Sequence, residues 1–293
     1  MDTSKQIVLI TGAKIVAAKR RFDDRQDVTY LHYKDTIYKM NSAAGVAFVL
    51  AKNGYAVYVQ VTSDLTAEVL AGLDIVPEDR CFRQDLTDAR QADELVSIIA
   101  TAQQQSGLDV ALVHYGSASE AAGGLPDASL GVDVWDTPAS EVHSLINANI
   151  VTLYHMMQSC QRFCIFERQQ KTKAILISAI AAVRPRVGFG LDNIQKAAGH
   201  ALSRTLALEL AKDDIHITEL LVGSLDGGYY DNDATLAHSI ESSKGLGYEY
   251  QMDTKPVFSA EQVGEAALYA LEARCNVRQM TIAPFGQYPQ MGA

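Results

Sequence analysis

Two charged side chains in the second half of the sequence are spaced to meet on one face of a helix. Asp192 and Lys196 stand four residues apart in a segment, about 192–212, whose pattern is helical. Residues at positions i and i+4 are neighbours on a helix surface, and a nearby lysine favours the ionised form of an aspartate. The pair therefore predicts a base that abstracts a proton. The alternative is an ordinary salt bridge on the helix.

Two arginines precede this helix. Arg184 and Arg186 follow Ser178, which stands at the end of a strand-like apolar run. Guanidinium groups suit carboxylate and phosphate groups because they bind both oxygens at once. The arginines therefore predict contact with an anionic part of a substrate, and the alternative is ordinary surface charge.

Strand-like runs alternate with helical patterns along the chain. Strands are expected at 7–10, 56–61, 80–85, 109–113, 174–177, 215–222 and 279–283, and helices at 44–53, 89–104, about 139–168, about 192–212 and about 260–273. This alternation predicts an α/β fold, a doubly wound parallel sheet of about seven strands with helices on both faces, in three layers. Its ligand belongs at the carboxyl ends of the strands.

Two segments interrupt the alternation, an insertion at about 14–40 and a loop at about 223–258 that is rich in Gly, Ser, Asp and Tyr. Loops of this length in a compact domain are usually functional lids or are disordered. Neither segment is expected to build a core of its own, so residues 1–293 are expected to form one domain.

The insertion is locally basic in an acidic chain. Its charged residues are Lys14, Lys19, Arg20, Arg21, Arg25, Lys34 and Lys39, against Asp23, Asp24, Asp27 and Asp35. Residues 28–33 have a strand-like composition and predict half of a hairpin. Three interpretations stay open: a lid that closes on phosphates, a contact between subunits, and a solvated or disordered loop.

The bulk composition restricts the class of protein. The chain is 48% hydrophobic, which allows a sizeable core, and its net charge of −10 argues against general binding to nucleic acid. We expect no signal peptide and no membrane span, because no apolar stretch is long enough. The four cysteines show no metal-ligand grouping and are expected to be reduced thiols. A cytoplasmic protein without a metal fits these features.

The first strand and the helix after the insertion carry a family resemblance. Thr11-Gly12-Ala13 ends the strand, and Asn41-Ser42-Ala43-Ala44-Gly45-Val46-Ala47 opens the helix. With the insertion removed, this order resembles the opening βαβ unit of the short-chain dehydrogenase/reductase superfamily, whose glycine-rich turn holds the pyrophosphate of NAD(P) at a helix N-terminus. Gly12 alone keeps its glycine, since the two later positions are Asn41 and Ala43. The order after residue 41 looks more like the enoyl-acyl carrier protein reductases.

Further motifs extend the resemblance over nearly the whole chain. Asp85-Leu86 resembles the adenine-contacting segment, and Val113-His114-Tyr115-Gly116 stands where most members carry Asn-Asn-Ala-Gly. Val222-Gly223-Ser224 replaces a usual Pro-Gly turn. The resemblance implies a cofactor site formed by Gly12, Asn41, Ser42, Ala43, Thr62, Asp85, Leu86, Val113, His114 and Lys196. For His114 the alternative is a packed or solvated histidine.

The resemblance also implies catalytic roles. Ser178 matches the serine that hydrogen-bonds the carbonyl oxygen, Lys196 the lysine that holds the nicotinamide ribose, and Asn149 the asparagine that anchors a proton-relaying water. For Ser178 the alternative is a turn hydroxyl. The family's tyrosine position is Asp192 on the usual alignment and Phe189 on the enoyl reductase pattern, so the usual proton donor is absent on both. The candidate replacements are Asp192, Tyr115, Tyr229 and Tyr230.

The resemblance implies NADP or NAD as cofactor. The segment Val61-Thr62-Ser63-Asp64 lacks, at the expected place, the acidic residue of NAD-preferring members, since Asp64 comes slightly late. Basic residues of the insertion could reach a 2′-phosphate, which favours NADP.

The resemblance implies an atypical oxidoreductase that acts on a small or carrier-bound carbonyl or enoyl compound. A homodimer or homotetramer with the long helices packed between subunits is expected. The alternative is a non-redox protein on the same fold: a nucleotide-binding regulator, a structural subunit, or an isomerase or lyase with Asp192 as its base.

Overall fold

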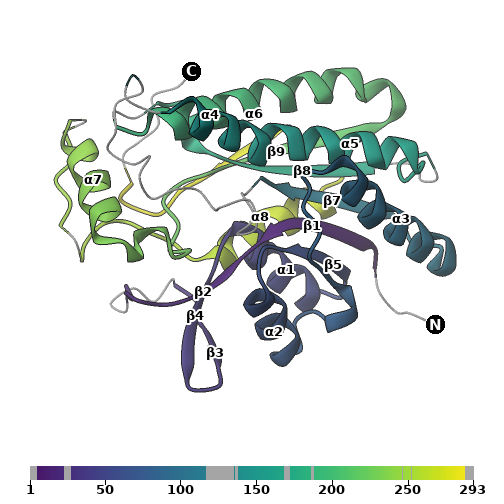
Figure 1. Ribbon diagram of the computed structural model, residues 1–293, viewed down its shortest axis with the longest axis horizontal. Helices are drawn as coiled ribbons and strands as arrows, with labels where there is room; N and C mark the ends of the chain where they lie inside the picture. The colour runs from purple at the N-terminus through teal and green to yellow at the C-terminus, as the bar shows by residue number, and fades with distance from the viewer. Residues whose placement is uncertain are drawn as a thin grey trace.

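A seven-stranded parallel sheet forms the centre of the molecule, with the strand order β10–β9–β8–β7–β1–β5–β6. The computed structural model describes residues 5–22, 28–116, 135, 138–167, 172–185, 188–245, 247–251 and 253–287. Helices cover both faces of the sheet (Figure 1). The predicted α/β fold, a doubly wound sheet in three layers, is confirmed.

The sheet consists of short buried strands. They are β1 (Ile7–Ala13), β5 (Ala56–Val61), β6 (Cys81–Phe82), β7 (Val110–Tyr115), β8 (Thr172–Ala179), β9 (Ile215–Val222) and β10 (Gln279–Ile282). One face packs against α3 (Ala89–Ser106), α5 (Thr152–Arg162) and α6 (Gly190–Glu209), and the other against α1 (Ser42–Lys52), α2 (Asp64–Gly72) and α8 (Ala260–Glu272). The strand predicted at 80–85 is only two residues long, and α2 was not predicted.

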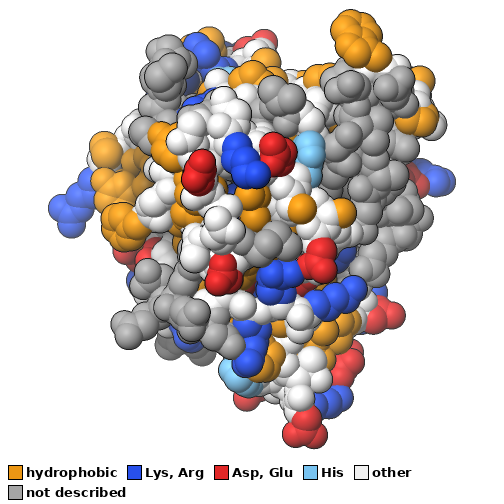
Figure 2. Space-filling view, turned by 90° about the vertical axis from the view of Figure 1, so that its left-hand side faces the viewer, with side chains coloured by type: hydrophobic (Ala, Val, Ile, Leu, Met, Phe, Trp, Pro, Cys, Tyr) orange, Lys and Arg blue, Asp and Glu red, His pale blue; other side chains and the backbone are white. Residues whose placement is uncertain are grey.

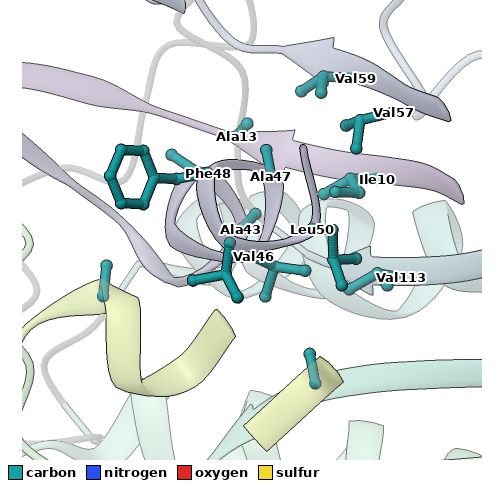
Figure 3. Packing of buried hydrophobic residues seen from close by; sticks show 14 of the residues in the cluster. Ile10, Ala13, Ala43, Val46, Ala47, Phe48, Leu50, Val57, Val59 and Val113 are labelled. Atoms are coloured by element: carbon teal, nitrogen blue, oxygen red, sulfur yellow. The ribbon is translucent and has the colours of Figure 1, made fainter. Parts of the chain in front are cut away.

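The apolar run of β1 reflects burial on both faces. Ile7 and Leu9 belong to the core under α3 and α5, whereas Val8 and Ile10 belong to the core under α1. Alternate residues of a strand point to opposite faces, so both sets must be apolar. Figure 3 shows Ile10 beside the buried residues of α1.

The helix predicted at 139–168 has three parts. It consists of α4 (Ala139–Ile146), a π-helical turn (Asn147–Val151) and α5. Such turns insert one extra residue into a helix and often occur at functional sites. Here the turn contains Asn149.

The insertion forms a small antiparallel sheet of β2 (Ile15–Ala17), β3 (Leu31–Tyr33) and β4 (Thr36–Met40), in the order β2–β4–β3. Strands β3 and β4 pair as a hairpin that projects from the main body in Figure 1. Residues 28–33 were predicted to form half of a hairpin, and β3 at residues 31–33 confirms this. The interpretation as a solvated or disordered loop is therefore wrong for its described residues. Residues 23–27, with Asp23, Asp24, Arg25 and Asp27, lie outside the described residues.

The segment predicted as a long loop at 223–258 contains a 3-10 turn (Tyr229–Asp231) and the helix α7 (Asp233–Lys244). Asn232 caps α7 by accepting a hydrogen bond from the Thr235 N–H at 3.1 Å. Leu236 and Ile240 of α7 pack against Phe22 of the insertion in a satellite core. The two interrupting segments therefore share buried apolar residues. No described helix combines the length and apolar character that a membrane crossing requires.

Helices α1 and α8 approach so closely that a glycine is required between them. A Cβ at Gly45 would overlap the carbonyl group of Ala260. Gly45→Ala should therefore lower the free energy of unfolding by about 1–3 kcal/mol, as overpacking does. Urea unfolding followed by circular dichroism measures the change.

Gly199→Ala in α6 is the matched control. Its Cβ would meet the Ile150 Cδ1 atom at 3.7 Å, an ordinary contact, so replacing a helical glycine there should leave stability unchanged or raise it by up to about 1 kcal/mol. Equal effects of the two substitutions would contradict this packing.

Candidate active site

The carboxyl ends of β7, β8 and β9 border one cleft. Its wall includes Ser178, Asp192 and Lys196, three of the four predicted catalytic residues. The fourth, Asn149, accepts a hydrogen bond on Oδ1 from Lys196 Nζ at 3.2 Å. The structure therefore brings the four residues together from β8, α6 and the π-helical turn.

The Ser178 hydroxyl lies near the carboxyl end of β8. The residue is half-buried and makes no side-chain hydrogen bond within the described part of the chain. The hydroxyl can therefore donate to a ligand atom in the cleft.

The carboxamide of Asn149 is held in one orientation. Its Nδ2 donates to the Leu145 carbonyl at 3.1 Å and to Gln195 Oε1, which leaves Oδ1 for Lys196. Gly116 at the end of β7 allows this approach, because a Cβ there would lie 2.7 Å from the Asn149 Cα atom. The π-helical turn and β7 thus fix the position of the Lys196 ammonium group.

The two residues that align with the missing tyrosine, Asp192 and Phe189, lie in different parts of the structure. Asp192 lines the cleft and accepts a hydrogen bond from Gln195 Nε2 at 3.1 Å. Phe189 is 1% exposed, and its ring centroid lies 4.9 Å from that of His238 on α7, in the core rather than in the cleft wall. Of the two aligned positions, Asp192 is therefore the one in the cleft wall.

The alternative of a helix salt bridge is wrong. Within the described residues, Lys196 Nζ has no carboxylate oxygen within 4.0 Å and instead bonds Asn149. Gln195, which sequence reasoning missed, connects Asn149 and Asp192 through its two amide atoms. The available signal was its place in the sequence, three residues after Asp192 and next to Lys196 in the predicted helix.

All three candidate tyrosines line the cleft, in different settings. Lys196 Nζ lies 5.3 Å from the ring centroid of Tyr115. Tyr230 is buried and donates to Ser224 Oγ at 3.4 Å, and half-exposed Tyr229 packs edge-on against it. Tyr115 is thus the tyrosine next to Lys196.

Of the two arginines predicted to contact an anionic group, Arg184 also lines the cleft, whereas Arg186 lies outside the described residues.

His114 belongs to a buried network at the end of the sheet. Its Nδ1 lies 2.9 Å from Thr11 Oγ1, and its Nε2 lies 3.4 Å from Thr152 Oγ1. Thr152 donates its own proton to the Ala148 carbonyl, so its oxygen accepts from Nε2–H. Burial, and then the charge of Lys196, lower the pKa of His114 to about 3. The neutral ring therefore has both nitrogens engaged by side chains of the protein.

Asn41 joins the ends of the insertion. Its Nδ2 donates to the Gly12 carbonyl at 2.8 Å, and its Oδ1 accepts from the Lys14 N–H and from the Ala44 N–H, both at 3.0 Å. Asn41 and Ser42 line the cleft at the N-terminus of α1, whereas Ala43 is fully buried. Gly12 adopts φ +76°, which favours glycine.

The remaining predicted cofactor residues Thr62, Asp85, Leu86 and Val113 do not line this cleft. The Thr62 N–H donates to the Ala13 carbonyl at 3.1 Å, and Asp85 Oδ1 accepts from the Thr87 N–H at 3.0 Å. Leu86 and Val113 are buried in the core.

Sequence reasoning missed Gln60, whose Oε1 accepts a hydrogen bond from the Gly12 N–H at 2.7 Å. A glutamine inside the apolar run of β5 was its signal.

Several cations of the insertion already have acidic partners. Arg20 pairs with Asp233, Lys34 with Glu68 at 2.6 Å, and Lys39 with Asp226 at 2.6 Å. The face seen in Figure 2 accordingly shows acidic and basic side chains next to one another. Within the described residues, no group of three His, Cys, Asp or Glu side chains is arranged to hold a metal ion.

The buried neutral histidine predicts a dependence of stability on pH. Between about pH 6.5 and pH 3 the unfolded chain binds a proton at His114 that the folded chain does not bind, so stability falls as the pH falls. Wild type should lose about 2 kcal/mol more unfolding free energy than His114→Asn between pH 7 and pH 5. Urea unfolding at both pH values measures this difference. His32→Asn, which changes an exposed histidine of β3, should behave as wild type, and equal losses in all three proteins would refute the assignment.

Known proteins resemble this chain over most of its length. A family model described as enoyl-(acyl carrier protein) reductase matches residues 41–274. An uncharacterized oxidoreductase of Staphylococcus aureus (strain MW2) is 26% identical over 203 residues, which are 68% of this chain and 74% of the relative.

Solved structures show the same fold. An alcohol dehydrogenase from the archaeon Thermococcus sibiricus, complexed with 5-hydroxy-NADP, has a TM-score of 0.63 and 17% identity, with 98% of this chain and 99% of the other covered. A 3-ketoacyl-(acyl-carrier-protein) reductase from Brucella melitensis, complexed with NADH, has a TM-score of 0.64 and 17% identity, with coverages of 95% and 97%. Together with the family model, this likeness establishes that the chain belongs to the short-chain dehydrogenase/reductase superfamily.

Proposed function

We propose that the protein is an NAD(P)-dependent oxidoreductase that acts on a small or carrier-bound carbonyl or enoyl compound. The observation that carries the proposal is a single cleft bordered by Ser178, Tyr115 and Lys196 and, on another side, by the N-terminus of α1. A hydroxyl, a phenol and an ammonium group beside a helix N-terminus are the groups that carbonyl reduction with a dinucleotide requires.

The residues present fit one end of a nicotinamide cofactor. The cleft volume of about 190 Å³ is below the roughly 300–1,000 Å³ of ordinary ligand pockets, so it suits the nicotinamide and its ribose rather than a whole dinucleotide. Lys196 would hold the ribose, and the first turn of α1 at Asn41 and Ser42 would face the phosphates. When bound, the cofactor supplies or accepts the hydride.

The proton that accompanies the hydride is assigned to Tyr115. A phenol keeps its proton at neutral pH and can donate it, whereas an ionised carboxylate can only accept one. The neighbouring Lys196 ammonium group would stabilise the phenolate left behind, and Asn149 holds that ammonium group in place. Ser178 would donate a hydrogen bond to the substrate oxygen.

NADP is the preferred cofactor in this proposal. Asp64, the acidic residue nearest the expected ribose position, is paired with Arg83 and so is less able to repel a phosphate. Lys14 follows Ala13, whose carbonyl meets the end of β5 at Thr62. Lys39, in contrast, is fully buried and has no access to a cofactor phosphate.

A second candidate function is an isomerase or lyase that binds the nucleotide without redox chemistry. The observation in its favour is the carboxylate of Asp192 at the position of the family's tyrosine. Gln195 orients this carboxylate from the same helix. In that case the base, and not Tyr115, would carry the essential proton transfer.

Titration with NADPH and NADH, followed by protein fluorescence, combined with turnover assays on carbonyl compounds separates these functions. Wild type should bind NADPH more tightly than NADH. Lys196→Met should raise the Kd for NADPH by at least about tenfold, because it removes the ammonium group that is proposed to hold the ribose. Tyr115→Phe should lower kcat on a panel of carbonyl compounds by about 100-fold, the usual contribution of a general acid, while the Kd changes little. Arg90→Met, at an exposed residue paired with Asp88, is the control.

The outcomes decide between the candidates. Binding of neither nucleotide overturns the proposed function. Binding without turnover, or a large loss of activity in Asp192→Asn but not in Tyr115→Phe, favours the second candidate.

We also propose a homodimer or homotetramer, a single domain over residues 1–293 and a cytoplasmic location. The free thiols of buried Cys81 and Cys160 support a reducing compartment. Exposed apolar side chains on α5 and α6 support packing between subunits: Tyr154 is 52% exposed, Ile194 45% and Leu208 72%.

Leu208→Glu should dissociate this assembly, because a charge would then face the partner subunit. Sedimentation velocity should show the smaller species for Leu208→Glu and the wild-type species for Leu65→Glu, which changes an exposed leucine on α2 at the opposite layer. A monomeric wild type, or identical profiles of the two variants, would contradict the proposal.

A further inference from the structure

A lysine of the insertion is completely buried between two aspartates of the segment after β9. Lys39 Nζ donates to Asp226 Oδ1 and to Asp231 Oδ1, each at 2.6 Å. The side chains of Lys39 and Asp226 are 0% exposed, and that of Asp231 is 8% exposed. This ion cluster lies outside the predicted catalytic residues.

The insertion supplies further donors to the same carboxylates. The Tyr30 hydroxyl donates to Asp226 Oδ2, and the Lys19 N–H donates to Asp231 Oδ2, both at 2.9 Å. Burial raises the pKa of Asp226, and the Lys39 ammonium group opposes this shift. A buried charged group needs such partners, because removal of one member of a buried ion pair leaves the charge of the other member uncompensated.

The backbones of the two segments are also in close contact. A Cβ at Gly227 would lie 3.1 Å from the Met40 carbonyl oxygen and 3.3 Å from the Asn41 Cα atom. Gly228 adopts φ +92° with its Cα against the side chain of Val16. Glycines therefore allow the segment to lie directly on β2 and β4.

Residues 226–231, which lie against the insertion, form part of the cleft wall. Gly227, Tyr229 and Tyr230, which stand between the two aspartates, line it. Tyr230 also belongs to the satellite core with Phe22 of the insertion. The position of this cleft wall is therefore determined by contacts with the insertion.

We propose that Lys39 is a positioning residue that, through Asp226 and Asp231, holds residues 226–231 against the cleft, so that the insertion sets the shape of the substrate side. The role in substrate choice rests on the proposed function, whereas the positioning role does not. Lys39 touches no reacting atom, since its ammonium group is enclosed by the two carboxylates and by the Phe22 ring, 5.6 Å from Nζ.

Hydrogen exchange of the full chain tests the positioning role without a substrate. In Lys39→Met, amides of residues 226–244 should exchange at least about tenfold faster, while those of β1, β7 and β8 keep wild-type rates, because local opening needs only the lost cluster. Lys34→Met, which removes an exposed lysine of the same insertion paired with Glu68, should leave all rates unchanged. Uniformly faster exchange, or no selective change, would overturn the proposal.

Two further variants keep the test decisive if Lys39→Met folds poorly. Asp231→Asn keeps the Lys39–Asp226 pair and should give a smaller increase confined to the same amides. In the double variant Lys39→Met/Asp226→Asn no charge of that pair remains, so exchange should be slower than in Lys39→Met alone. Exchange in the double variant that is as fast as in Lys39→Met, or faster, would show that the pair does not act as a unit and would contradict the proposal.

The role in substrate choice is tested with an accepted carbonyl compound. The KM for this compound should be at least about fivefold higher in Lys39→Met than in Lys34→Met, and the Kd for NADPH should stay within about twofold of wild type. An unchanged KM together with faster exchange would reject the role in substrate choice. If wild type bound neither nucleotide, the proposed function would fail, and the exchange rates would still decide the positioning role.

Discussion

Parallel strands that are buried on both faces impose the constraint from which the site follows. All strands of such a sheet end at the same edge, and the helices that cover the two faces begin near it. Tyr115 ends β7, and Ser178 stands near the end of β8. Asn41 caps the N-terminus of α1, and Lys196 lies in the second turn of α6, so these residues all line the same cleft. Residues that are far apart in the chain therefore meet without any specialised loop.

The same edge receives two long additions to the chain, and burial of charge holds them together. The insertion after β1 donates hydrogen bonds, and the segment after β9 accepts them on Asp226 and Asp231. Because Lys39 is removed from water, loss of its carboxylate partners would leave a buried charge without compensation. The glycine contacts and the satellite core extend this pairing, so that one wall of the cleft is anchored to the turn that opens α1.

Local patterns in the sequence predicted the main elements but not the contacts between them. The alternation of apolar runs predicted the strands, and family spacing pointed to Ser178 and Lys196, which the structure brings to one cleft. The i,i+4 spacing of Asp192 and Lys196 left a helix salt bridge open as an alternative. The ammonium group instead bonds Asn149 of the π-helical turn, because a single i,i+4 ion pair on a partly solvated helix face is weak and yields to tertiary contacts. Lys39 and Asp226 are 187 residues apart, and no periodicity links such a pair. Helix α7 was missed because its short apolar stripe lies in a segment rich in turn residues.

The central claim is that a nicotinamide lies in the cleft beside Ser178, Tyr115 and Lys196. A crystal structure of the protein grown with NADPH tests it directly. The account predicts electron density for the nicotinamide ribose within hydrogen-bond distance of Lys196 Nζ, with the ring facing Ser178 and the phosphates at the first turn of α1. Density for the cofactor elsewhere on the molecule, or a crystal at saturating NADPH whose cleft contains only water, would contradict it.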